Sequence, residues 1–277
     1  MKHNPKVEIL IDSDKMPFVS IVVPVHNQEE IISKVITSIF TKTKQLFELI
    51  IIFDGCTDLS RENAINSIVK SQNLCRVTLL TNQNGIFETS CDNQGFMISR
   101  SEFIIEIQAD MIIEEEDYDV LLCRPLIQYT DIIAVSGRCC HQVIDDTKGI
   151  GKLGMLVQQP HKIKDKSKLF LSQTCNRGPL ILRKSMLVAL NYLDEEHYAL
   201  GDDEHDLFAR AWVQKKWRTG FFPIEYQSRI EWGSTRKSRP AHVQQYLNMR
   251  LRNISDGFLN KNKHSILFPQ DEIRELT

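Results

Sequence analysis

The first 110 residues alternate between apolar runs and amphipathic helical segments, and this alternation limits the folds open to the chain. The apolar runs lie at 18–27, 47–53, 76–81 and 103–107, and a segment with helical spacing of its apolar residues follows each of the first three. Long apolar runs indicate strands that are buried on both faces. Strands that alternate with helices predict an α/β sandwich with a central, mostly parallel sheet and helices on both faces.

Polar residues follow three of these strands at the point where each strand ends. His26 and Asn27 follow the first, Asp54 the second and Asp110 the fourth. The carboxyl ends of parallel strands meet at one edge of the sheet, and ligands of such folds bind outside that edge. We therefore predict a binding site there.

The first strand is not followed by the glycine fingerprint of a dinucleotide fold or of a P-loop. A nucleotide at this edge would need a cation to offset its phosphates, and Asp110 is suited to Mg²⁺ or Mn²⁺, which prefer carboxylate and water. The alternative is that Asp110 only caps a turn. The other polar groups at the same edge favour a function.

The second half of the chain is less regular. We expect a strand within 131–139, a turn into a strand at 176–185, a helix at 202–217 and an amphipathic helix at 241–258. The turn contains Asn176, Arg177 and Gly178, which either contribute to an acceptor pocket or only reverse the chain. Four acids lie within residues 202–206, which is more than a helix N-terminus needs for its own stabilisation.

Composition excludes several classes of function. Basic and acidic residues nearly balance, 34 against 36, so nucleic-acid binding is not expected. No apolar segment approaches the roughly 20 residues of a membrane helix, and the first residues do not resemble a signal peptide. The seven cysteines are odd in number and lack metal-site spacing, so we expect reduced thiols, no zinc site and a cytoplasmic protein.

Four motifs occur in the order found in one enzyme family: SIVVPVHNQEE, IIIFDGCTD, the segment from NQNG to QADM, and LGDDEHDLFARAWVQKKW. Together they resemble the inverting, nucleotide-sugar-dependent glycosyltransferases of family 2, which have the GT-A fold. The resemblance covers residues 18–235. It implies a nucleotide-binding half at 18–110 and an acceptor half at 111–235, preceded by a polar lead-in at 1–17 and followed by a C-terminal helix and tail at 236–277.

The resemblance also implies roles for individual residues. Asp54 would face the base, usually uracil, and Asp110 would hold Mn²⁺ or Mg²⁺ on the diphosphate. The residues expected around the nucleotide-sugar donor, most simply a UDP-sugar, are Pro24, His26, Asn27, Glu29, Asp54, Asn93 and Gln108. The acceptor would be a glycan, a lipid-linked molecule or a protein.

The acidic motif would supply the base that deprotonates the acceptor hydroxyl as it attacks the anomeric carbon. Its overlay on the family places this role on Glu204 or on the adjacent Asp203. The metal would stabilise the departing nucleoside diphosphate and replace a general acid. His205, which lies between these acids, either tunes the base, binds the metal or is structural.

The chain departs from the family at Gln108, where the metal motif usually begins with an acid, at Phe53, and at Asp92, where a basic residue is frequent. The main alternative is therefore a nucleotide-binding or scaffold module that has lost catalysis. A nucleotidyltransferase would need a basic, glycine-rich loop after the first strand, which is missing. A basic segment, Ser234 to Lys237, either closes over the diphosphate or is a solvated loop.

Overall fold

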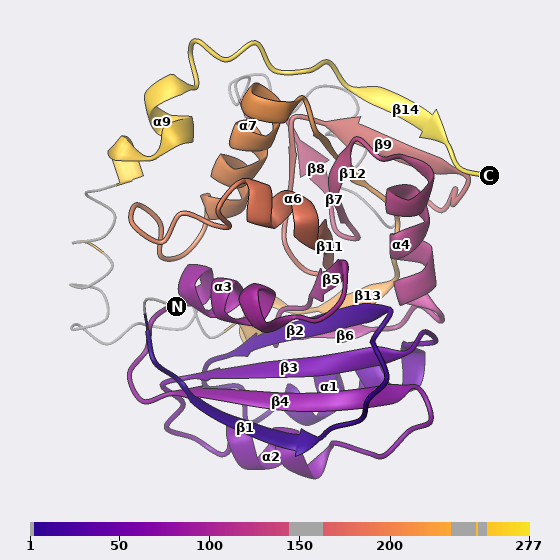
Figure 1. Ribbon diagram of the computed structural model, residues 1–277, viewed down its shortest axis with the longest axis vertical. Coiled ribbons are helices and arrows are strands. Elements are labelled where there is room, and N and C mark those ends of the chain that lie inside the picture. The colour runs from indigo at the N-terminus through magenta and orange to yellow at the C-terminus, as the bar shows by residue number, and fades with distance from the viewer. Residues whose placement is uncertain (1–2, 144–162, 234–247, 249–253) are drawn as a thin grey trace.

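The computed structural model describes residues 3–143, 163–233, 248 and 254–277 (Figure 1). The basic segment 234–237 and most of the expected helix at 241–258 lie outside these residues. Among the described residues, ten strands form one sheet in the order β1-β4-β3-β2-β5-β11-β7-β12-β9-β14. The strands of this sheet are β1 (Lys6–Ile11), β2 (Val19–Val25), β3 (Phe47–Asp54), β4 (Leu74–Asn82), β5 (Phe103–Glu106), β7 (Ile132–Ser136), β9 (Lys168–Ser172), β11 (Leu180–Arg183), β12 (Arg218–Phe221) and β14 (Glu272–Glu275).

Two small ladders stand outside this sheet, β6 (Met111–Ile113) with β13 (Tyr226–Ser228) and β8 (Cys140–His141) with β10 (Thr174–Cys175). The described helices are α1 (Ile32–Lys42), α2 (Ser60–Asn66), α3 (Glu88–Ile98), α4 (Tyr118–Gln128), α6 (Lys184–Ala189), α7 (Asp203–Lys215) and α9 (Phe258–Asn262), with short 3-10 turns η3 (Ile230–Trp232) and η4 (Ile254–Asp256). The predicted strand–helix alternation of the first half is confirmed.

The apolar runs bury both faces of the sheet because successive side chains of a strand point to opposite sides. Ile21 and Val23 of β2 pack into a core with α1, whereas the intervening Val22 packs against Phe96 of α3 and Phe208 of α7. In Figure 1, α1 and α2 accordingly lie on one side of the sheet and α3 on the other. The expected layers of helix, sheet and helix are present.

The sheet is parallel in its first half and mixed beyond it. Strands β4, β3, β2 and β5 are parallel neighbours, and β11 then runs antiparallel between β5 and β7. It follows that β7 points the same way as β5. The carboxyl ends of β2, β3, β5 and β7 and the amino end of β11 therefore share one edge, and consecutive connections diverge there between β2 and β5, which is where such folds bind ligands.

The two ends of the described chain differ from expectation. Within the expected lead-in, residues 6–11 form β1, which pairs antiparallel with β4 at the edge of the sheet. At the other end, the expected tail contains β14, which pairs with β9 and closes the opposite edge (Figure 1). No described helix is long and apolar enough to cross a membrane.

Candidate active site

A buried arginine and the acids around it form the polar centre of the binding edge. Arg177 is only 5% exposed. Its Nη1 lies 3.1 Å from a carboxylate oxygen of Glu88, and its Nη2 lies 3.0 Å from one of Asp92. Nη2 also donates a hydrogen bond to Oδ2 of Asp203. We call these four residues the Arg177 cluster.

The cluster joins three elements that are far apart in the sequence. Glu88 and Asp92 are four residues apart on α3 and therefore share a helix face. Asp203 is the first residue of α7, and Arg177 lies in the turn before β11, whose amino end is at the binding edge. An ionised carboxylate is costly to bury without a partner, so these acids depend on the single guanidinium.

The two candidate bases, Asp203 and Glu204, have different surroundings. Burial raises the pKa of Asp203, but the Arg177 guanidinium and hydrogen bonds, including one from the backbone N–H of Glu204 at 3.0 Å, outweigh it and hold that pKa below its ordinary value. Burial raises the pKa of Glu204 well above its ordinary value, against the effect of Arg177, and the Asp203 charge adds to the rise. Among the described residues, Oε2 of Glu204 has no hydrogen-bond partner.

This difference separates the roles of the two acids. Asp203 is an ionised partner of Arg177, and both of its oxygens are engaged. Glu204 keeps a high proton affinity and an open carboxylate oxygen, which are the properties of a general base. The ring of His205 lies beside it, with Nε2 4.0 Å from Glu204 and Nδ1 2.6 Å from the Thr174 hydroxyl. Burial lowers the pKa of His205, which favours the neutral ring.

Another acid, Glu106, ends β5 and is fully buried. One of its oxygens accepts the backbone N–H of Gly178 at 3.1 Å, and the other has no partner among the described residues. Burial raises the pKa of Glu106 to about 8, although the Arg177 charge acts in the opposite direction. Glu106 therefore holds the turn at 178, and its raised pKa favours the protonated form.

The expected metal motif occupies the same edge. Gln108 is half-buried; its Nε2 donates to Glu88 at 3.0 Å, and its Oε1 accepts from Nη1 of Arg138 at 3.5 Å. Asp110 is half-buried just before β6. Gln108 thus links the motif to the Arg177 cluster.

These residues do not fit a metal ion held at both positions of the motif. Mg²⁺ sites use one or two carboxylates together with substrate phosphates, and the motif retains only Asp110. The Arg138 guanidinium beside Gln108 opposes a second cation by like charge. Among the described residues, no group of three His, Cys, Asp or Glu side chains is arranged to hold an ion.

The predicted base-binding residue, Asp54, lies at the end of β3 but is only 6% exposed. Its two oxygens accept the backbone N–H groups of Ile86 at 2.7 Å and Phe87 at 2.9 Å. Nδ1 of the exposed His26 lies 2.5 Å from the backbone oxygen of Asp54. Asp54 therefore orders the turn that enters α3, and any contact with a base uses the remaining acceptor capacity of its oxygens.

Three more predicted donor residues lie around the end of β2. Asn27 has a positive φ of 48°, and its side-chain oxygen accepts the N–H of Thr57 at 2.9 Å. Glu29 is exposed and accepts the N–H of Leu59 at 3.1 Å. These bonds bind the turn after β2 to the turn after β3. Pro24, inside β2, is half-buried.

The remaining predicted donor residue, Asn93, has a different position. It is 2% exposed, and its amide nitrogen donates to the backbone oxygen of Leu193 at 2.9 Å and to Glu195 at 2.7 Å. Its side-chain oxygen accepts the N–H of Leu193 at 3.1 Å. These bonds tie α3 to the loop before α7.

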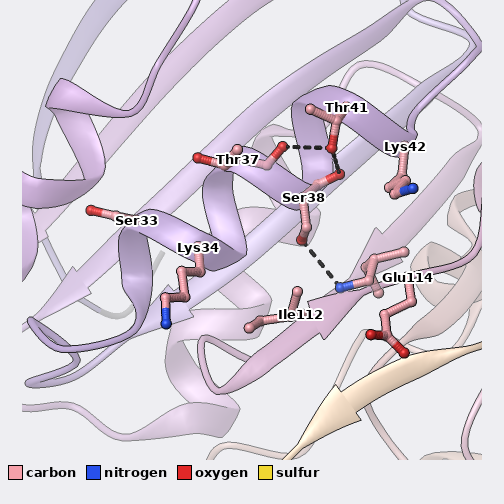
Figure 2. A pocket seen from close by; sticks show the side chains of 9 residues that line it. Ser33, Lys34, Thr37, Ser38, Thr41, Lys42, Ile112 and Glu114 are labelled. Carbon is pink, nitrogen blue, oxygen red and sulfur yellow. Dashed lines mark hydrogen bonds between the residues drawn. The ribbon is translucent and has the colours of Figure 1, made fainter.

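Figure 2 shows an open groove of about 600 Å³ between α1 and β6, which none of the predicted site residues lines. The hydroxyl of Ser38 accepts the N–H of Ile113 at 3.1 Å and donates to the oxygen of Val35 at 2.7 Å. Thr41 donates to carbonyl oxygens of its own helix. The hydroxyls of this groove thus anchor β6 to α1 and stabilise the helix.

Sequence reasoning missed three polar residues of this edge, Glu88, Glu106 and Arg138, and it missed the pairing of Arg177 with acids. One signal was available, because Glu106 is an acid inside an apolar run. Asp92, which replaces a residue that is often basic in the family, was also informative, since Arg177 supplies the missing positive charge from another part of the chain.

Comparisons with known proteins agree with this architecture. Glucosyl-3-phosphoglycerate synthase from Mycobacterium tuberculosis, solved with Mn²⁺, UDP and glucosyl-3-phosphoglycerate, superimposes with a TM-score of 0.56 at 16% identity, over 92% of this chain and 81% of that one. Mannosyltransferase PcManGT from Pyrobaculum calidifontis, in complex with GDP-Man and Mn²⁺, gives 0.55 at 13% identity, over 95% and 80%. At such identities these similarities show the fold alone.

Sequence comparison identifies the family. Glycosyltransferase GlyG from Streptococcus pneumoniae serotype 4 is 28% identical over 115 residues, which are 42% of this chain and 37% of that relative. The profile of Glycosyl transferase family 2 matches residues 20–187, more than half of the 277 residues. The chain therefore belongs to glycosyl transferase family 2 and has a GT-A fold.

Proposed function

We propose that the protein transfers a sugar from a UDP-sugar to an acceptor hydroxyl with inversion, and that Glu204 is the general base. The assignment rests on one carboxylate oxygen of Glu204, next to the Arg177–Asp203 ion pair. This oxygen is buried and has no hydrogen-bond partner among the described residues. Family membership supports the reaction class. The fold supports a donor site at the shared edge of the sheet.

In this mechanism Glu204 accepts the proton of the acceptor hydroxyl while the oxygen forms a bond to the anomeric carbon. The bond from that carbon to the diphosphate breaks on the opposite side, and the nucleoside diphosphate leaves with the electron pair. Arg177 holds Asp203 ionised and in place, so Glu204 is the acid at this position that exchanges a proton. The reaction therefore requires deprotonated Glu204, and its rate is expected to rise with pH through the elevated pKa.

The choice of uridine rests on Asp54 and His26, which lie at the ends of two adjacent strands. A carboxylate accepts hydrogen bonds only, and uracil offers an N–H donor on its pairing edge, as guanine and thymine also do, whereas cytosine offers an amino group. The solved relatives contain UDP in one case and GDP-mannose in the other, so the base is the first property to test.

A thermal-shift screen tests the proposal with UDP, GDP, CMP and dTDP, each with Mn²⁺ and with EDTA. A ligand that binds only the folded protein raises its melting temperature by mass action. We expect a rise of several degrees with UDP and little with the others. A rise with GDP instead would show that the donor carries guanine and not uracil. No rise with any nucleotide would contradict the proposed donor site and support the non-catalytic scaffold.

A further inference from the structure

The register of three strands brings a second arginine to the donor edge. Leu180 of β11 faces Glu106 of β5 on one side and Ser136 of β7 on the other. Gly178 lies two residues before Leu180, Gln108 two residues after Glu106 and Arg138 two residues after Ser136, so all three lie at the same edge of the sheet. A Cβ atom at Gly178, whose φ is +62°, would lie 3.1 Å from Oε1 of Gln108, so the glycine leaves room for this side chain.

Gln108 is oriented by its two neighbours. Its Nε2 donates to Glu88, and its Oε1 accepts from Arg138. Aspartate at this position has no N–H to donate and would place a negative charge beside Glu88. The amide is thus the side chain that suits both neighbours, and it turns its oxygen toward the guanidinium.

Within the described part of the chain, no carboxylate pairs with the positive charge of Arg138. Arg177 is surrounded by acids. The guanidinium of Arg138, in contrast, makes no ion pair with a described acid, and among the described residues it has one hydrogen bond, of 3.5 Å, to the amide oxygen of Gln108. Arg138 is half-buried two residues beyond β7, at the edge where the donor is proposed to bind. A guanidinium in this setting is suited to binding an anion.

We propose that Arg138 binds the diphosphate of the donor and supplies the positive charge that a metal bound by two acids would otherwise supply, so that donor binding does not require a divalent ion. The inference rests on the proposed function in that the donor is a nucleoside diphosphate sugar. Arginine forms paired hydrogen bonds with phosphate and stays charged at every working pH. It also stabilises the negative charge that gathers on the diphosphate as the bond to the sugar breaks.

Titration calorimetry with UDP, in EDTA and in Mn²⁺, tests the inference on the wild type and on Arg138→Gln. We expect the wild type to bind UDP in EDTA, with an affinity that Mn²⁺ changes less than about threefold. Arg138→Gln should lose about 10- to 100-fold in EDTA, the usual effect of removing a charged hydrogen-bond partner. Uridine, which lacks phosphate, should bind both proteins equally.

Two further variants sharpen the result. Arg61→Gln removes an arginine of α2 that pairs with Glu8, and it should leave UDP affinity unchanged. Gln108→Asp restores the usual acid, and it should weaken UDP binding in EDTA and make it dependent on Mn²⁺. Melting temperatures of all variants show whether each protein is folded.

UDP binding by the wild type only with Mn²⁺ overturns the inference and leaves the proposed function intact. Equal UDP affinity of the wild type and Arg138→Gln in EDTA also overturns it. If no nucleoside diphosphate binds under either condition, the donor site itself is wrong and the inference falls with it.

Discussion

At the scale of single residues, carboxyl groups of the same edge differ in charge because their partners differ. Asp203 touches Arg177 and receives a backbone hydrogen bond, and its pKa lies below the ordinary value. Glu106 accepts a hydrogen bond from the backbone N–H of Gly178, and burial raises its pKa to about 8. Sequence alone identified the acids near 204 but could not tell which is ionised, since the cation, Arg177, is 26 residues away from Asp203.

The state of Glu106 predicts how stability depends on pH. Its pKa is about 8 in the folded protein and near 4.5 when unfolded, so the folded state binds the extra proton. The contribution of Glu106 to the free energy of unfolding is complete below pH 4.5 and is lost as pH rises to about 8. Burial raises the pKa of Asp92 and Glu204 as well, so their contributions fall in the same direction.

Glu106→Gln isolates the effect of this residue, because the amide oxygen still accepts the N–H of Gly178. Urea unfolding at pH 5 to 8 should show that the free energy of unfolding falls less steeply with pH in the variant than in the wild type. Parallel curves for the two proteins would show that Glu106 does not carry a proton in the folded state.

At the scale of elements, the turn before β11 depends on Gly178. Its φ is +62°, and a Cβ atom there would lie 2.5 Å from Sδ of Met111. A left-handed conformation costs a residue with a side chain about 1–2 kcal/mol. Gly178→Ala should therefore lower the free energy of unfolding by about 2 kcal/mol or more, since crowding of Met111 and Gln108 adds to the backbone strain.

Gly201 provides the matched control for this substitution. Its φ is +76°, but no atom lies within 4 Å of a Cβ placed on it. Gly201→Ala should show the cost of backbone strain alone. Equal destabilisation of the two variants in chemical denaturation would show that the neighbours of Gly178 do not constrain the turn.

The elements of the first half could be predicted because their signals are local. The run from Val19 to Val25 and the apolar face of α1 are readable within a few residues. The edge strands β1 and β14 could not be predicted in this way. They are held by backbone pairing, and side chains such as Val7 and Ile273 stay about half exposed, so the sequence there has no strong apolar pattern. The Arg177–Glu88 contact spans 89 positions and leaves no local pattern.

At the scale of the whole molecule, the last strand closes the second half. Arg274 binds Asp131 through two hydrogen bonds of 2.7 and 2.9 Å, and Arg124 donates to the backbone oxygen of Leu276 at 3.0 Å. Deletion of residues 271–277 removes β14 and exposes the edge of β9. We expect a melting temperature several degrees lower and a greater tendency to aggregate, because unpaired strand edges associate.

Circular dichroism and light scattering measure this effect. Lys261→Ala, which removes one exposed ion pair with Asp256, should melt like the wild type. An unchanged melting temperature after deletion of 271–277 would mean that the C-terminal strand contributes nothing to stability.

The whole molecule also explains why the candidate site was only partly predictable. The sequence indicated both parts, the strand ends of the first half and the acidic motif at 202–206. It did not show that α3, β11 and α7 meet at Arg177, because that contact depends on the antiparallel insertion of β11 between β5 and β7. The hydrogen bonds of Asn93 to Leu193 and Glu195 span about 100 positions and were not predictable for the same reason.

Comparison of Glu204→Gln with the wild type tests the central claim most directly. The assay measures release of nucleoside diphosphate from the donor sugar identified by the nucleotide screen, with calorimetry of UDP in parallel. We predict unchanged UDP affinity and a turnover about 100- to 10 000-fold lower, the usual effect of losing a general base. Full turnover in Glu204→Gln would contradict the account.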